Sequence, residues 1–266
     1  MATEQQTAGR IEQALSQSVP FPKAMPGLPR ELTVQQKMAC AARVLAFEGC
    51  TLNVAGHITV VKEGSTDLWV NGYGTWWEEL SASDICTIDA DGYVTDGPWD
   101  VTPAIAIHTE LHRARPDAKV VIHNHPHYAT LLATMHLLPE ITDQQASMFD
   151  GEMVLFDEYT GGVDDEESGR YLANAIGPSA SVIVLANHGV IIIGSSIEET
   201  AYKLTTFERT CRLNYEAMVT GKGGVPVPPD LRQALKPMLL SDRMTVRYYW
   251  DGAVRQLLRR DPDVLD

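Results

Sequence analysis

Three histidines lie close together in the stretch VVIHNHPHYATLLA, which runs from Val120 to Ala133. His123 and His125 come directly after an apolar run, and Pro126 follows them. Alternate side chains of a β-strand point to the same side. A strand that extends to residue 125 would therefore present both imidazoles together, while His127 would turn away or begin the next helix. Neutral imidazoles bind zinc, iron, manganese or cobalt, so the spacing makes this pair a candidate metal site.

A third ligand would have to come from another part of the chain, and His188 in ANHGV is the best candidate. It lies at a break between two apolar runs, where Gly189 favours a turn. His57, directly after Gly56 at the start of a predicted strand, also has a site-like position. The motif HxH alone is a weak signal, because most histidines are packed or surface polar groups. His112 and His136 are expected on helix surfaces.

The positioning elements follow from hydrophobic periodicity. Apolar or alternating runs predict strands at 57–62, 67–71, 118–123 and 180–194, the last broken at its centre, with a hairpin at 84–94. Helical periodicity predicts helices at 32–49, 103–115, 127–135, 164–176 and 196–219. Ser196 and Glu199 form the pattern of a capping box at the start of the last helix. This is an α/β domain with helices on both faces of a sheet. Its expected parts are an N-terminal arm (1–30), a main domain (31–222) and a largely helical C-terminal tail (223–266).

Composition excludes several classes of partner. The chain of 266 residues has a formal net charge of −14, which argues against nucleic-acid binding. An acidic protein needs local compensation to bind an anionic substrate, and a bound cation would supply it. We expect no membrane span, since the chain lacks a long apolar run, and a cytoplasmic location, since its start is polar. The cysteines form no CxxC pair and are expected to be buried free thiols: Cys40, Cys50, Cys86 and Cys211.

Several motifs in order resemble the class II aldolase/adducin family, whose best-known members are fuculose-phosphate aldolases. They run from residue 34 to 219 and include NVAGHITV, VNGYGTWWEELSASDI, RPDAKVVIHNH, NHGVIIIGSSIEETA and ERTCRLNYEA. The resemblance implies a three-layer fold whose central, mainly antiparallel sheet has helices on both faces. It implies a homotetramer or larger homo-oligomer with sites at subunit contacts, where the C-terminal tail would pack. It also implies that His123, His125 and His188 hold one divalent transition metal per subunit.

The chain departs from the aldolase pattern at the catalytic acid. Aldolases of this family carry Ser-Glu before the helix, and that glutamate is both a metal ligand and the base; here Pro103 and Ala104 occupy these positions. An alanine can neither ligate a metal nor accept a proton. Two phosphate contacts are also changed. In GHIT, His57 stands where aldolases have asparagine, and before the helix Thr102 or Pro103 stands where they have serine. A sugar-phosphate aldolase is therefore disfavoured.

Decarboxylation suits a site that lacks this glutamate, because carbon dioxide leaves without proton abstraction. The resemblance extends to metal-dependent decarboxylases of hydroxypyridine dicarboxylates and to iron-dependent decarboxylating oxygenases. We therefore expect a metal-dependent carboxy-lyase that acts on a small hydroxylated, aromatic or heteroaromatic carboxylic acid. The alternatives are a non-haem iron oxygenase, an aldolase with a relocated base, and a non-catalytic adducin-like interaction module.

The remaining candidate site residues follow from position. His108 lies one helical turn after Ala104 and, like His57, is a candidate proton donor; a packing role is the alternative for His108. Tyr159 in DEYTGG follows the metal region and is a third catalytic candidate. The candidate substrate-binding residues lie in VNGYG and just before the helix at 103–115: Asn71, Tyr73, Gly74 and Thr102.

Overall fold

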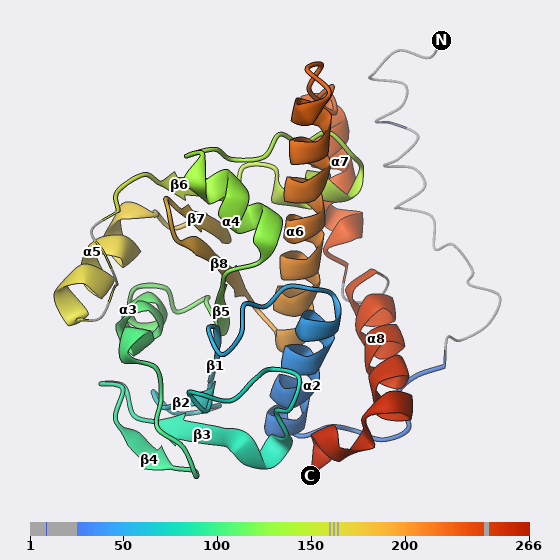
Figure 1. Cartoon of the computed structure of the whole chain (residues 1–266). Helices are drawn as coiled ribbons and strands as arrows, with labels where there is room; N and C mark the ends of the chain where they lie inside the picture. The colour runs from blue at the N-terminus through green and yellow to red at the C-terminus, as the bar shows by residue number, and fades with distance from the viewer. Residues whose placement is uncertain (1–8, 10–25, 160, 162, 164, 242–244) are drawn as a thin grey trace.

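The computed structural model describes residues 26–159, 161, 163, 165–241 and 245–266, together with Gly9. Most of the predicted N-terminal arm, residues 1–30, lies outside this part of the chain. The described residues form a sheet with helices packed on both of its faces (Figure 1). The expected three-layer arrangement is therefore confirmed.

The sheet is mixed. Its strands follow the order β4-β3-β2-β1-β5-β8-β7-β6. Strands β6 and β7 pair in parallel, whereas the other neighbouring strands are antiparallel, so the expectation of a mainly antiparallel sheet needs this correction. The strands are β1 (His57–Val61), β2 (Leu68–Asn71), β3 (Ile85–Ile88), β4 (Val94–Asp96), β5 (Val120–Asn124), β6 (Met153–Phe156), β7 (Val182–Leu185) and β8 (Gly189–Gly194).

The helices match the predicted periodicity closely. One difference lies at 103–115, where a 3₁₀ turn (Pro103–Ile105) precedes the α-helix and the backbone departs from helical geometry at Ala104. Another lies at the start of α6, where the hydroxyl of Ser196 caps the helix but the carboxylate of Glu199 binds the backbone N–H of Ser195. The helices are α2 (Val34–Phe47), α3 (Ala106–Ala114), α4 (His127–Thr134), α5 (Glu166–Ala175), α6 (Ile197–Val219), α7 (Pro229–Leu239) and α8 (Arg247–Arg260).

The two faces of the sheet bury different helices because successive side chains point to opposite sides. Residues such as Ile58 and Ile122 face the core formed with α2, α4, α6 and α8. Their neighbours in sequence, such as Val121, face α3 and α5 instead. His57, Thr59 and His123 alternate with the first set, so the sheet directs them towards α3.

The C-terminal residues pack on the same chain. Helix α8 contacts α2 and α6, and the chain end is tied back to α2 by the buried guanidinium of Arg43, which binds Asp263 at 2.8 Å. The four cysteines are buried and free, as expected. Within the described residues, no helix combines the length and the apolar character needed to cross a lipid bilayer.

Candidate metal centre

Most of the predicted site residues lie at one edge of the sheet, where β5 ends and β1 and β8 begin. His57 at the start of β1 is the register partner of His123 near the end of β5, and Asn124 is opposite Val190 at the start of β8. Because β5 is antiparallel to both neighbours, its last residues meet the first residues of β1 and β8. The loop that contains His188 directly precedes β8 and therefore opens at this edge as well.

The three predicted metal ligands converge at this edge. The ligand nitrogens of His123, His125 and His188 lie within 4.8 Å of one another. The Nε2 atoms of His123 and His125 are 3.1 Å apart, and His188 has ring-centroid distances of 4.8 Å to each of these two rings. Strand β5 ends at Asn124, so His125 lies one residue beyond the strand, yet its ring still turns towards that of His123. Three clustered imidazoles are a donor set that suits a divalent transition metal.

Backbone contacts set the orientation of the imidazoles. The Nδ1 atom of His123 lies 3.0 Å from the carbonyl oxygen of Val190, to which it donates, so its Nε2 keeps a free lone pair. Such a bond typically fixes the tautomer and orientation of a metal-binding histidine. Gly189 lets β8 approach closely, since a Cβ at this position would lie 2.4 Å from Cδ2 of His125. These contacts hold the ligand nitrogens facing one another.

The start of α4 receives its cap from a distant helix. Pro126 is the N-cap residue and provides no side-chain hydrogen bond. The carboxylate of Glu208, on α6, accepts instead from the backbone N–H groups of Tyr128 and Ala129, each at 2.8 Å. A carboxylate at a helix N-terminus also interacts favourably with the helix dipole. Glu208 thus anchors the segment that directly follows His125.

Burial keeps three of the clustered imidazoles neutral at pH 7: His57, His123 and His125. Burial, followed by the neighbouring imidazoles, lowers the pKa of His57 to about 3. Burial and His188 lower the pKa of His125 to about 4. The pKa of His123 is lowered well below its usual value, again chiefly by burial. Neutral imidazoles have the free lone pair that metal binding requires, so these electrostatics fit the proposed ligand set.

His57 and His108 lie beside the ligands. The His57 ring is 5.4 Å from the ring of His123 and 5.5 Å from that of His108, measured between centroids. Both side chains are buried, and each has a ring nitrogen with no hydrogen-bond partner among the described residues. His112 also points inward, towards Thr59, so the expectation that it lies on a helix surface is wrong. His136 is exposed, as expected, but follows the end of α4.

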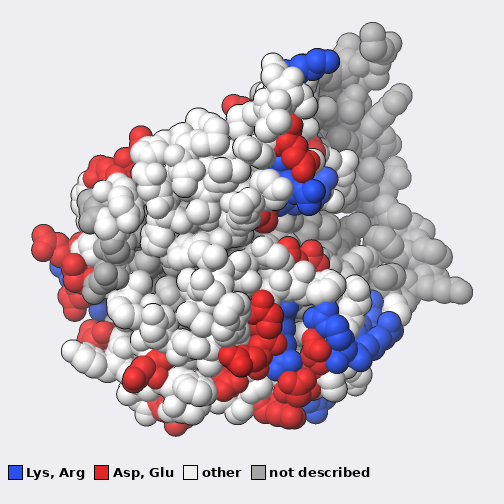
Figure 2. Space-filling view, viewed as in Figure 1, with Lys and Arg blue, Asp and Glu red and all other residues white. Residues whose placement is uncertain are grey.

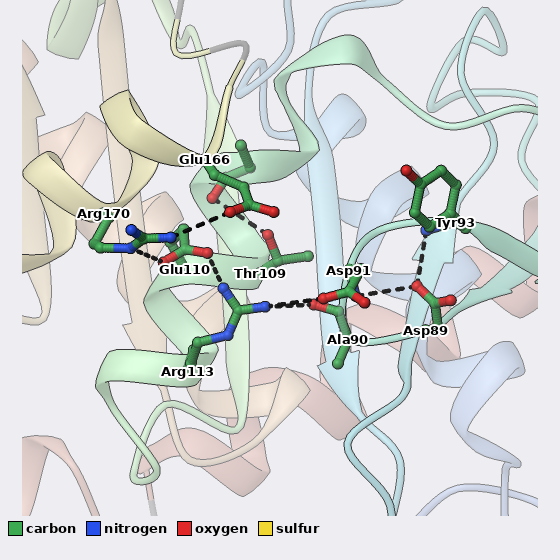
Figure 3. A network of polar contacts seen from close by, with 10 residues as sticks. Asp89, Ala90, Asp91, Tyr93, Thr109, Glu110, Arg113, Glu166 and Arg170 are labelled. Carbon is green, nitrogen blue, oxygen red and sulfur yellow. Dashed lines mark hydrogen bonds and ion pairs between the residues drawn. The ribbon is translucent and has the colours of Figure 1, made fainter.

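Helix α3, which contains His108, is anchored by a buried carboxylate (Figure 3). Glu110 pairs with Arg113 on its own helix and with Arg170 of α5, and Arg113 also bonds the carbonyl oxygen of Ala90. Gly169 allows close contact between α3 and α5, because a Cβ there would lie 2.6 Å from the carbonyl oxygen of Ala106. Ala104 lies in the 3₁₀ turn before α3. Its partly buried methyl group packs on the apolar cluster that includes Ile107 and Leu111.

Two of the predicted substrate-binding residues form backbone contacts instead. The amide oxygen of Asn71 accepts from the N–H of Ile58 at 2.8 Å, and its amide nitrogen donates to the carbonyls of Gly56 and Gly72. Thr102 caps the 3₁₀ turn by accepting from the N–H of Ala104 at 3.2 Å. These contacts use the polar atoms of Asn71 on the backbone, so the structure favours a positioning role for it.

The other candidates are more exposed. Tyr73 follows β2 at the site edge, and its side chain is 48% exposed; the positive φ of Gly74, 89°, suits the turn that comes next. Tyr159 follows β6, which is separated from β5 by β7 and β8. Adjacent strands are about 4.8 Å apart, so β6 lies roughly 14 Å from β5. Tyr159 is 59% exposed.

Thr59 lies near the site but was not named from the sequence, and His112 was expected on a helix surface. Thr59 comes close to His108 only through the packing of α3 on the sheet, whereas His112 lies one helical turn after His108 on α3. The alternation of β1 was the available signal, because it places Thr59 on the same face as His57. No local pattern connects Thr59 to the two histidines that lie about 50 positions later in the chain.

Comparison with known proteins places this geometry in a family. Residues 36–215 match the family model "Class II Aldolase and Adducin N-terminal domain". The chain is 30% identical over 215 residues to 4-hydroxy-3-prenylphenylpyruvate oxygenase/4-hydroxy-3-prenylbenzoate synthase of Streptomyces roseochromogenus subsp. oscitans, covering 79% of this chain and 76% of the relative. It is 31% identical to the decarboxylase NovR of Streptomyces niveus, covering 79% and 78% of the two chains. A solved L-fuculose 1-phosphate aldolase from Glaciozyma antarctica PI12 has the same fold, with a TM-score of 0.77, 21% identity and coverage of 91% and 97%. The chain belongs to the class II aldolase and adducin family.

Proposed function

We propose that the chain is a metal-dependent carboxy-lyase that acts on a small hydroxylated, aromatic or heteroaromatic carboxylic acid. One observation carries the proposal: three histidines converge as a candidate ligand set, while the turn before α3 has Ala104 where aldolases of the family have an acid. Relatives that are about 30% identical include one named a decarboxylase and one named an oxygenase, which supports the assignment. His123, His125 and His188 would hold a zinc, iron, manganese or cobalt ion.

A bound cation would act as a Lewis acid and withdraw electrons from an oxygen of the substrate. The chain's own residues then need to orient the acid and to transfer one proton. Loss of carbon dioxide breaks a carbon–carbon bond and leaves an electron pair on carbon, which then takes up a proton. His108 and His57 are the buried imidazoles closest to the ligand set that could handle this proton. Burial also excludes water that would compete for the reactive carbon.

Carbon dioxide release under anaerobic conditions tests the proposal. The full chain is loaded in turn with zinc, iron, manganese or cobalt and screened over hydroxyaryl and hydroxypyridine carboxylic acids. Metal-dependent release of one carbon dioxide per substrate without oxygen is the expected result. Release of an aldehyde in place of carbon dioxide would identify an aldolase. Protein that binds no metal and turns over no acid would indicate an interaction module.

A second candidate is a non-haem iron decarboxylating oxygenase, which is favoured by the relative that carries oxygenase in its name. Three histidines leave coordination positions free, as oxygen chemistry at iron requires. Oxygen consumption coupled to carbon dioxide release, strictly with iron, would select this candidate. Turnover with zinc in the absence of oxygen would exclude it.

We also propose a homotetramer or larger homo-oligomer. Figure 2 shows a broad surface over α4 and β8 that lacks charged residues, although the chain carries many acidic groups. Exposed apolar side chains on the chain include Trp76, Met135 and Leu137. Larger uncharged patches of this kind are typical of protein–protein contacts. Light scattering coupled to size-exclusion chromatography should give the mass of at least four chains, and a monomer would contradict the proposal.

A further inference from the structure

A chain of buried hydrogen bonds leads from the backbone to His108. The carbonyl oxygen of Ala118 lies 2.7 Å from Nδ1 of His112. Nε2 of His112 lies 2.8 Å from the hydroxyl of Thr59, and the same hydroxyl lies 2.7 Å from Nδ1 of His108. Thr59 and His108 are fully buried. These hydrogen bonds therefore link β1, the segment before β5 and α3 without requiring water.

The direction of each bond follows from the carbonyl at one end. A carbonyl oxygen only accepts, so Nδ1 of His112 must carry a proton. Burial lowers the pKa of His112 to about 4, so this ring is neutral and its Nε2 is an acceptor. The Thr59 hydroxyl donates its single proton to that nitrogen. It must then accept from His108, whose Nδ1 consequently carries the proton.

The other ring nitrogen of His108 is left as an unprotonated acceptor. It is buried and has no hydrogen-bond partner among the described residues. The His108 ring lies edge-on to that of His57, which in turn lies beside His123. A buried acceptor without a hydrogen bond destabilises the folded chain, so packing alone is a poor reason for it. A substrate hydroxyl is the kind of group that would satisfy it.

We infer that Ala118, His112 and Thr59 hold His108 in the tautomer whose Nε2 accepts a proton, so that His108 receives the substrate hydroxyl proton before it donates one. His108 is the catalytic residue in this scheme, and His112 and Thr59 are positioning residues. This role of the tautomer in turnover rests on the proposed carboxy-lyase function. The tautomer itself does not depend on that function, because it follows from the hydrogen bonds together with the neutral state of the buried His112 ring.

The proton balance closes in four steps. The substrate O–H bond breaks and an N–H bond forms at Nε2 of His108, while Nδ1–H stays bonded to Thr59. The bond to the carboxylate carbon then breaks, carbon dioxide leaves, and its electron pair stays on the ring carbon. The proton on Nε2 moves to that carbon and returns His108 to its neutral form. A solvent proton restores the hydroxyl group as the product leaves. Burial disfavours the charged imidazolium, so His108 holds the proton only between its removal from the hydroxyl and its delivery to carbon.

Nitrogen-15 NMR of the full chain tests the tautomer directly, in the metal-free and zinc-loaded forms. In the wild type we expect Nδ1 of His108 in the protonated range and Nε2 in the unprotonated range. Thr59→Val removes the hydroxyl with little change in shape, and Thr59→Ser retains it. His112→Phe removes the acceptor, which frees the hydroxyl to donate to His108. Nε2 should therefore move towards the protonated range in Thr59→Val and His112→Phe but not in Thr59→Ser.

Kinetics supply the second readout. Thr59→Val should lower kcat at least about tenfold, within the range for general acid–base catalysis, with KM changed less than about twofold. Thr59→Ser should restore most of kcat. A protonated Nε2 in the wild type, or an unchanged tautomer in both Thr59→Val and His112→Phe, would overturn the inference. If the tautomer shifts as expected while no acid releases carbon dioxide, the proposed function fails and the tautomer assignment stands.

Discussion

His57 and His123 are register partners on adjacent antiparallel strands, and their ring centroids lie 5.4 Å apart. This pairing brings His123, a proposed metal ligand, and His57, which lies outside the proposed ligand set, to the same face of the sheet. The conversion of the aldolase GN turn to GHI therefore places an imidazole beside the ligand set. It also brings the ring centroid of His57 within 5.5 Å of that of His108, so the β1–β5 pairing places a proposed metal ligand beside the imidazoles proposed to transfer the proton.

Removal of one ligand should abolish tight metal binding. His123→Ala leaves two imidazoles, and we expect the metal Kd to rise about 100-fold or more, since loss of supporting groups alone typically costs 10–100-fold. Metal content by elemental analysis and competition with a chelator measure the effect. His127→Ala is the matched control, because His127 is exposed and only two residues beyond His125. Equal metal affinity in His123→Ala and the wild type would contradict the assigned ligand set.

Gly189→Ala should weaken metal binding without touching a ligand residue. The added Cβ would lie 2.4 Å from Cδ2 of His125 and 2.6 Å from the carbonyl oxygen of Asn124, so the His125 ring has to shift. We expect the metal Kd to rise at least about tenfold, by the loss of ligand orientation. Gly252→Ala on α8 is the control, because its Cβ meets only the end of Arg255 at 4.0 Å. Unchanged affinity in Gly189→Ala would show that the site tolerates this displacement.

Ala104→Glu should convert the site towards the aldolase pattern. A carboxylate at this position could occupy a coordination position that the substrate needs. We expect tighter metal binding and a loss of carbon dioxide release of about tenfold or more, because the carboxylate competes with the substrate for the cation. Ala104→Gln has a similar size without the charge and separates steric from electrostatic effects. Full activity in Ala104→Glu would argue against direct use of this position by the substrate.

Acid should destabilise the metal-free protein through its buried histidines. Burial lowers the pKa of His112 in the folded chain from its ordinary value of 6.5 to about 4. As the pH falls, the unfolded chain therefore binds this proton at a higher pH than the folded chain does. The free energy of unfolding is highest above pH 6.5 and decreases as the pH falls to about 4. One such group contributes a slope of about 1.4 kcal/mol per pH unit in this window. Denaturant unfolding at several pH values measures the slope.

The variant His112→Phe removes this titration and should reduce the slope between pH 6.5 and pH 4. The comparison concerns the slope alone, so a uniform loss of stability in the variant does not affect it. A wild-type slope equal to that of His112→Phe would indicate that His112 titrates normally in the folded chain.

Local patterns in the sequence determined the elements and the ligand candidates. The alternation of His123 and His125 after an apolar run, and the turn at His188–Gly189, are short-range features, so they predict how each side chain is presented. The cap at Ser196 is equally local and forms as predicted on the Ser196 side. The substitution at Ala104 is visible from the order of family motifs. These features together sufficed to predict the fold and three converging histidines.

Strand register and helix packing decided the rest. Asn71 looked like a substrate contact, but pairing of β2 with β1 brings the backbone of Ile58 to its amide. Thr59 meets His108 and His112, which lie 49 and 53 residues later in the chain, only because α3 packs on that face of the sheet. Hydrogen-bond partners at such separations depend on the closure of long loops, which no local propensity encodes. The residues that could bind a metal were therefore predictable from the sequence. The hydrogen-bond directions around them, and with these the tautomer of His108, could be inferred only from the tertiary structure.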